Sequence, residues 1–104
     1  MKLIVPLDFS ENSIKALEFA IGLADKKHGE IILVHVVELV YDFESQSALA
    51  LDSLFKDAEN LMKKTIQTYE GSGVPMESQV VEGTASVTIA RIAEEQRAAL
   101  IVMG

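Results

Sequence analysis

The stretch Leu3-Ile4-Val5-Pro6-Leu7-Asp8-Phe9-Ser10 decides how this chain folds. Residues 2–7 form a β-branched apolar run, which is typical of a strand that is buried on both faces. Ser10 follows as an N-cap, and Phe9 and Ile14 occupy the two positions of a hydrophobic staple. A buried strand therefore leads through a short turn directly into a helix.

Three further strands are predicted along the chain. Residues 31–37 form a continuous apolar run, which indicates a strand covered on both faces, and residues 99–103 form the fourth strand. Residues 76–82 are more polar and predict a strand near a sheet edge. Residues 38–50 have a mixed composition and are predicted to form a long connection.

Three helices separate these strands. The first is predicted to run to Lys26-Lys27, two cations at its negative end, and to stop at Gly29. The second ends at Gly71-Ser72-Gly73, where Pro75 blocks its continuation, and the third begins after the turn Gly83-Thr84. Apolar residues at helical spacing predict the core faces of the three helices: Ile14, Leu17, Ala20 or Ile21, and Ala24; Leu51, Leu54, Phe55, Ala58, Leu61, Met62, Ile66 and Tyr69; Val87, Ile89 or Ala90, and Ala93.

The order β-α-β-α-β-α-β predicts an α/β fold of the Rossmann-like kind. Right-handed crossovers between successive strands give an open parallel sheet with helices on both faces. The length of 104 residues fits one domain, residues 1–104. With the strand order 3-2-1-4, the order reverses between strands one and four, and ligands bind at such a point.

Composition excludes several classes of function. The formal net charge is −7, and the only basic pairs, Lys26-Lys27 and Lys63-Lys64, fall on predicted helices, so nucleic acid is not an expected partner. No apolar run reaches membrane-spanning length, and Met1-Lys2 leads straight into a strand without the features of a signal peptide. The absence of cysteine excludes disulfides and thiolate chemistry, and it fits a cytoplasmic protein.

No catalytic or metal-binding constellation is recognisable. No serine lies in a nucleophile elbow, and neither Gly-x-x-x-x-Gly-Lys-Ser/Thr nor Gly-x-Gly-x-x-Gly occurs. His28 and His35 lack metal-ligand spacing; we predict a solvated helix end for His28 and a hydrogen-bonded place in or near the core for His35. Glu94-Glu95 and the pair Asp42 and Glu44 are predicted to be solvated.

Asp8 is the residue that suggests a site. It follows a buried strand and precedes a helix, which places it at the carboxyl edge of the sheet. Asp8 and Gly104 would then face each other across a crevice, with Val36 on the flanking strand. The alternative is a carboxylate that only interacts with the first turn of the helix. Pro6 is compatible with simple strand termination.

A glycine and two aromatic residues can each be interpreted in more than one way. Gly83 lies at the same edge of the sheet, and we assign it to a tight turn rather than to a ligand. Tyr41 and Phe43 fall in the predicted connection, where they fit a lid, a partner contact or a local packing cluster equally well.

Four segments together resemble the universal stress protein family in order and spacing: Ile4-Val5-Pro6-Leu7-Asp8-Phe9-Ser10, Leu33-Val34-His35-Val36-Val37, Val81-Glu82-Gly83 and Leu100-Ile101-Val102-Met103-Gly104. The resemblance implies a Rossmann-like sheet with strand order 3-2-1-4-5 and dimers formed through strand five. It also implies ATP as the ligand, with Mg²⁺ accompanying it, and a nucleotide site at Pro6, Leu7, Asp8, Val36, Met103 and Gly104.

The chain departs from the family pattern in two places. Ala99 stands where an aspartate is common, and only Gly104 of the glycine-rich phosphate motif is present. The fifth strand and the phosphate loop have no counterpart, so the domain at residues 1–104 is expected to be C-terminally incomplete. An apolar fourth strand with unpaired backbone groups then predicts self-association through residues 99–103, or poor stability.

The resemblance leaves three functions open. The leading one is a stress-response regulatory domain that binds ATP between strands one and four. The second is an interaction or dimerisation module that binds no nucleotide. The third is a slow ATPase, for which Asp8 offers no convincing general base.

Overall fold

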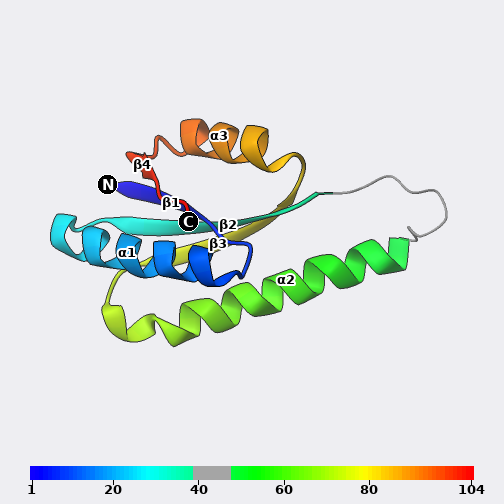
Figure 1. Cartoon of the computed structure of the whole chain (residues 1–104), viewed down its shortest axis with the longest axis horizontal. Coiled ribbons are helices and arrows are strands. Elements are labelled where there is room, and N and C mark those ends of the chain that lie inside the picture. Colours follow the sequence, from blue (N-terminus) through cyan, green and yellow to red (C-terminus); the bar gives the residue numbers. More distant parts are fainter. Residues whose placement is uncertain (39–47) are drawn as a thin grey trace.

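The computed structural model describes residues 1–38 and 48–104, with side chains from residue 51 onward in the second part. Strands and helices alternate along these residues, as Figure 1 shows. In chain order they are β1 (Lys2–Pro6), α1 (Glu11–Lys27), β2 (Glu30–Val37), α2 (Ala48–Thr68), the short 3-10 helix η1 (Glu70–Ser72), β3 (Met76–Glu82), α3 (Ala85–Glu95) and β4 (Leu100–Ile101). Tyr41, Asp42, Phe43 and Glu44 lie outside the described residues.

The strands form one parallel sheet in the order β3-β2-β1-β4. The predicted order is therefore confirmed, and β3 lies at an edge as its polar sequence indicated. β1 and β2 form the centre, where their apolar side chains are almost entirely buried. β4 is shorter than predicted, but its backbone pairing begins with the Ala99 amide on the Lys2 carbonyl at 2.8 Å and ends with the Val102 amide on the Ile4 carbonyl at 2.9 Å.

Helices cover both faces of this sheet, as predicted (Figure 1). On one face, side chains of α1 and α2 such as Leu17 and Met62 pack with Leu3, Val5 and Leu33. On the other face, α3 packs against the alternate strand residues; the buried members of that cluster are Ile4, Ile32, Val34, Ile89 and Ile92. Each central strand thus contributes to two cores, which is why its sequence is apolar without alternation.

Three predicted core positions are wrong. Val87 is 68% exposed, Leu54 51% and Leu61 44%. In α3 the buried face is formed by Thr88, Ile89 and Ile92, and α2 buries Ala58 and Met62. Helical spacing identifies an apolar stripe, but the width of the neighbouring surface decides how much of that stripe is covered.

The termini of α1 follow the predicted pattern with one correction. Ser10 is the N-cap, because its hydroxyl accepts a hydrogen bond from the Ser13 amide at 3.2 Å. The left-handed residue that ends the helix is His28, with φ of 52°, and not Gly29. Gly29 instead allows a close approach, since a Cβ there would lie 3.0 Å from the Met1 carbonyl oxygen. His28 is exposed, as predicted.

Candidate functional site

All six residues of the predicted site line one cavity at the carboxyl ends of β1, β2 and β4. The cavity has a volume of about 190 Å³. Its lining comprises the predicted Pro6, Leu7, Asp8, Val36, Met103 and Gly104, together with Ser10, Ser13, Val34, His35, Ala85 and Ile89. The structure therefore brings the two ends of the chain together at one crevice, and the role of these residues in binding a ligand stays a prediction.

The turn between β1 and α1 holds the polar wall of this cavity. The Ser10 amide donates to Asp8 Oδ1 at 2.9 Å, and the Ser13 hydroxyl donates to the Ser10 carbonyl at 2.9 Å. Phe9, between Asp8 and Ser10, has φ of 65°, a conformation that non-glycine residues adopt at some cost. The bond from the Ser10 amide fixes the direction of the Asp8 side chain at the rim, and the bond from Ser13 holds Ser10 in place.

Asp8 is ionised across the neutral pH range. The hydroxyl of Ser10, then its amide, and then Ser13 lower the pKa of the Asp8 carboxyl below its ordinary value. Hydrogen bonds to the charged form favour that form. Asp8 is also exposed, so its carboxylate can accept hydrogen bonds from a molecule in the cavity.

His35 holds the end of β1 from the neighbouring strand. Its Nδ1 lies 2.7 Å from the Leu7 carbonyl oxygen, and because a carbonyl only accepts, Nδ1 carries the proton and donates. The Phe9 ring packs against the imidazole with centroids 5.0 Å apart. The prediction of a hydrogen-bonded, near-core His35 is confirmed.

Backbone groups of Val36 remain available in the cavity. The last ladder bond between the two strands runs from the Leu7 amide to the Val34 carbonyl at 2.8 Å, while Val37 bonds on the other side, to the Gly83 amide at 3.2 Å. Successive residues of a parallel strand point their N–H and C=O groups to alternate sides. Val36 therefore directs both groups toward the β1 side, beyond the end of β1, where the described residues supply no backbone partner.

Gly104 closes the crevice by a close approach to α1. A Cβ at this position would overlap the Asn12 carbonyl oxygen and would lie 3.0 Å from the Ser13 nitrogen. Only glycine allows this distance between the chain after β4 and the first turn of α1. Met103 and Gly104 thus reach the same cavity as Asp8 from the opposite side.

The sequence analysis did not find the contribution of α3. Ala85 and Ile89 line the cavity, and the Ala85 amide is capped by the Glu38 carboxylate at 2.7 Å. The preceding Gly83 has φ of 153°, and a Cβ there would overlap Thr88 Oγ1, so this glycine serves the turn, as predicted. The sequence signal for Ala85 was its place directly after that turn. Ser13, three residues after the N-cap, had a comparable signal.

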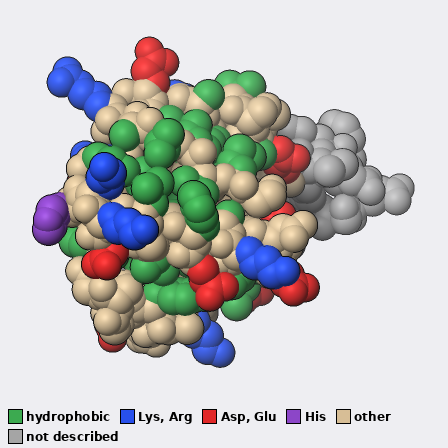
Figure 2. Space-filling view, turned by 60° about the vertical axis from the view of Figure 1, so that its left-hand side comes forward, with side chains coloured by type: hydrophobic (Ala, Val, Ile, Leu, Met, Phe, Trp, Pro, Cys, Tyr) green, Lys and Arg blue, Asp and Glu red, His purple; other side chains and the backbone are tan. Residues whose placement is uncertain are grey.

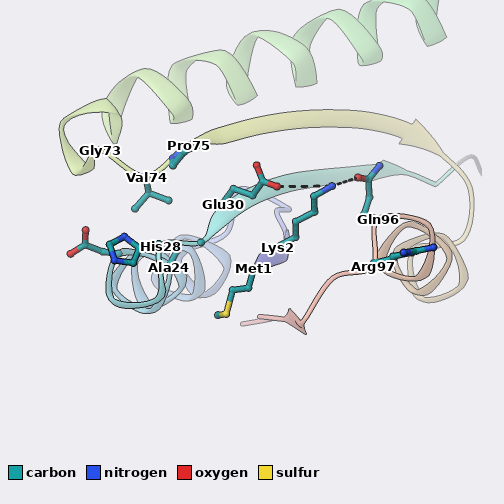
Figure 3. Close-up of a pocket in the computed structure, with 12 residues that line it drawn as sticks. Met1, Lys2, Ala24, His28, Glu30, Gly73, Val74, Pro75, Gln96 and Arg97 are labelled. Atoms are coloured by element: carbon teal, nitrogen blue, oxygen red, sulfur yellow. Dashed lines mark hydrogen bonds and ion pairs between the residues drawn. The ribbon is translucent and has the colours of Figure 1, made fainter.

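A second and larger concavity, about 710 Å³, lies at the opposite edge of the sheet (Figure 3). Lys2 crosses it, donating to Gln96 Oε1 at 3.3 Å and lying 4.0 Å from Glu30 Oε1. His28 and Arg97 stand at opposite ends and do not converge (Figure 3). Lys2, Gln96 and Glu30 therefore serve one another, and we assign the candidate site to the smaller cavity.

The described residues contain no cluster of three or more His, Cys, Asp or Glu side chains that could hold a metal ion. Among the described helices, none combines the length and the apolar character needed to cross a membrane.

Comparison with known proteins agrees with this architecture. The family model described as Universal stress protein family matches residues 1–104. A universal stress protein of Methanocaldococcus jannaschii is 29% identical over 107 residues, which cover 99% of this chain and 63% of that protein. The chain thus spans less than two thirds of the length of this relative.

Solved structures share the fold over the whole chain. A universal stress protein family member from Burkholderia pseudomallei has a TM-score of 0.87 and 26% identity, covering 99% of this chain and 80% of that one. A universal stress protein solved in complex with cAMP has a TM-score of 0.77 at 18% identity, covering 98% and 74%. A family protein from Arabidopsis thaliana with AMP bound has a TM-score of 0.71 at 17% identity, covering 100% and 75%.

Proposed function

Because the chain belongs to the universal stress protein family, we propose that it binds an adenine nucleotide in the cavity at the carboxyl edge of its sheet. Two family members that share its fold were solved with cAMP and with AMP, ligands that have adenosine in common. Binding would serve regulation in a stress response, following the resemblance of the sequence to a family whose role is ATP-linked regulation.

The observation that carries the proposal is the free backbone edge of Val36. One N–H donor and one C=O acceptor point to the same side in an otherwise largely apolar slot. Adenine offers a matching pair, an exocyclic amine donor beside a ring-nitrogen acceptor. Apolar side chains such as Pro6 and Ile89 line the slot, where they would contact the faces of the ring.

Asp8 supplies the second contact. Its ionised carboxylate at the rim accepts hydrogen bonds, and the ribose hydroxyls or the adenine amine are the donors that adenosine offers. The volume of about 190 Å³ is below the range of roughly 300–1,000 Å³ for complete ligand pockets. The described cavity therefore suits the nucleoside part of the ligand.

Among adenine nucleotides we propose ATP, following the resemblance of the sequence to ATP-binding family members. Mg²⁺ would arrive on the phosphates, since the described residues hold no metal cluster of their own. We also propose that the protein acts in the cytoplasm, which its lack of cysteine fits and which cell fractionation tests.

Calorimetric titration with ATP, ADP, AMP, cAMP, adenosine and GTP tests the nucleotide proposal. We expect every adenosine-containing ligand to bind and GTP to bind at least about tenfold more weakly, because guanine has an oxygen acceptor where adenine has its amine donor. Asp8→Asn should weaken binding about tenfold, and Glu82→Gln, an exposed carboxylate outside the cavity, should not.

Two results would count against the proposal. Equal affinity for GTP and ATP would show that the base edge is not read by Val36. No binding at millimolar nucleotide would remove the nucleotide claim and leave an interaction module.

We further propose that the chain self-associates through β4, as its sequence predicts. Figure 2 shows hydrophobic side chains gathered on the side of the molecule where β4 and the N-terminus lie, with charged side chains around and between them. At this edge Leu100 is 47% exposed, Ile101 41% and Met103 64%. An uncovered apolar edge strand with free backbone groups favours pairing with another chain.

A further inference from the structure

The helix α2 carries an exposed stripe that repeats every seven residues. The stripe consists of Leu54, Asp57, Leu61, Lys64 and Thr68, spaced alternately by three and four positions, and all five are exposed. This is the spacing of a helix–helix seam. The two leucines are about half exposed, although they are the most apolar residues of the stripe.

The sheet does not use this stripe. α2 packs on the sheet through a neighbouring face that includes Ala58, Met62 and Ile66. One end of the helix projects well past the strands (Figure 1). A surface along α2 therefore remains open to another molecule.

Two threonine hydroxyls near the leucines are satisfied within the helix. The Thr65 hydroxyl donates to the Leu61 carbonyl at 2.8 Å, and the Thr68 hydroxyl donates to the Lys64 carbonyl at 2.9 Å. Covering these hydroxyls consequently leaves no donor without a partner. The stripe combines two leucines, one threonine whose hydroxyl is already bonded within the helix, and two opposite charges.

We propose that this stripe binds the same stripe of a second copy, with the two α2 helices antiparallel and a two-fold axis at Leu61. Asp57 lies one turn before Leu61, and Lys64 lies one turn after it. Reversal of one helix sets each Asp57 opposite Lys64 of the partner subunit, on both sides of the axis. Leu61 then meets Leu61 of the partner subunit, and Leu54 meets the partner's Thr68.

Charge decides between this arrangement and a parallel one. Parallel helices in register would bring the two Asp57 side chains together and the two Lys64 side chains together, which is repulsive. The antiparallel pairing replaces both repulsions with attractions. It is also isologous, so it closes as a dimer and does not propagate.

The stripe is narrow, so the dimer is expected to be weak. The fifteen residues from Leu54 to Thr68 span about 21 Å of helix, a contact at the small end of protein interfaces. This interface is separate from the β4 edge, and it does not depend on nucleotide binding.

Sedimentation velocity over a concentration series, with charge-reversed variants, tests the proposal. Asp57→Lys and Lys64→Asp each turn both attractive pairs into repulsive ones, and each should raise the dimer dissociation constant about tenfold or more. Mixing the two variants restores opposite charges and should restore the dimer. The matched controls Glu59→Lys and Lys63→Asp reverse exposed charges of the same helix away from the stripe and should change little.

Cysteine cross-linking gives an independent readout, since the chain has no cysteine of its own. Leu61→Cys lies on the two-fold axis and should form a disulfide dimer on mild oxidation. Leu54→Cys should cross-link only when it is mixed with Thr68→Cys. Ile101→Lys, which disrupts the β4 edge, should leave these cross-links in place.

Three results would overturn the proposal. The chain could stay monomeric at all concentrations, or the mixture of Asp57→Lys and Lys64→Asp could fail to associate. Alternatively, Ile101→Lys could abolish the cross-links while leaving the circular dichroism spectrum unchanged. In the last case the association belongs to the edge of the sheet.

Discussion

Gly83→Ala should strongly destabilise the protein, because Gly83 combines two separate constraints. Its φ of 153° lies in a region that side chains rarely adopt, and a Cβ would also overlap Thr88 Oγ1. Thr88 is itself buried, with 6% exposure, so its side chain has little room to move away.

The two constraints allow the loss of stability in Gly83→Ala to be estimated. The backbone conformation costs a non-glycine residue about 1–3 kcal/mol, and forcing Thr88 off its rotamer adds about 0.5–1.5 kcal/mol. Together they predict a loss of about 1.5–4.5 kcal/mol. In urea this corresponds to a midpoint lower by roughly 1–2 M for a domain of this size.

Urea unfolding followed by circular dichroism measures this loss against a matched glycine. Gly71→Ala has no atom within 4 Å of the added Cβ, and it should change stability by no more than about 0.5 kcal/mol. In the Thr88→Ala background, the cost of Gly83→Ala should fall by about 0.5–1.5 kcal/mol, because the steric part is removed.

An unchanged midpoint for Gly83→Ala would refute the reasoning. If that variant were stable but had lost nucleotide binding, Gly83 would contact the ligand and would not serve the turn.

Other substitutions test separate features of the structure. Gly22 lies in the exposed middle of α1, with open space where a Cβ would stand. Gly22→Ala should therefore raise the free energy of unfolding by about 0.5–1 kcal/mol, and a lower urea midpoint would contradict this. Ser10→Ala should lower the free energy of unfolding by about 1 kcal/mol, because α1 loses its N-terminal cap. Thr84→Ala is the control and should lower it less, because the Thr84 side chain makes no capping hydrogen bond to α3. Equal urea midpoints for the two variants would argue against a stabilising cap at Ser10. The lowered pKa of Asp8 stabilises the fold above its unfolded value of 3.8, and this contribution disappears as the pH falls through the lower folded value. In a series of urea midpoints measured at different pH values, the wild type should therefore be more stable than Asp8→Asn at neutral pH and should lose this difference below pH 3.8. If the two midpoints change in parallel with pH, the Asp8 carboxylate does not stabilise the fold.

The sequence predicted those parts of the fold that depend on neighbouring residues along the chain. The N-cap Ser10 and the apolar run before it were sufficient for β1 and the start of α1, since both depend on neighbouring residues. The exposure of Leu54, Leu61 and Val87 was not predictable in this way. Their exposure depends on how far each helix overlaps the sheet, and the sequence of one helix does not determine this overlap.

The candidate site shows the same division. Asp8 and Gly104 were placed at one crevice because the carboxyl ends of parallel strands share one edge of the sheet. Ile89 was predicted only as a core residue, since its place in the cavity depends on the position of α3. The close approach of Gly104 to Asn12 has no local signal, because it joins residues at opposite ends of the chain.

Pro6 does more than end β1, because it also helps to shape the cavity. The register between β1 and β4 directs the backbone groups of Ile4 toward β4, where its carbonyl accepts the Val102 amide. Pro6, two residues later, points the same way, and it has no N–H to continue the ladder. Pairing with β4 therefore ends at Val102, and Met103-Gly104 can turn toward α1. On the other side β1 gives way to the Asp8 turn while β2 runs on, which leaves the edge of Val36 open. One proline and one turn thus create both walls of the cavity.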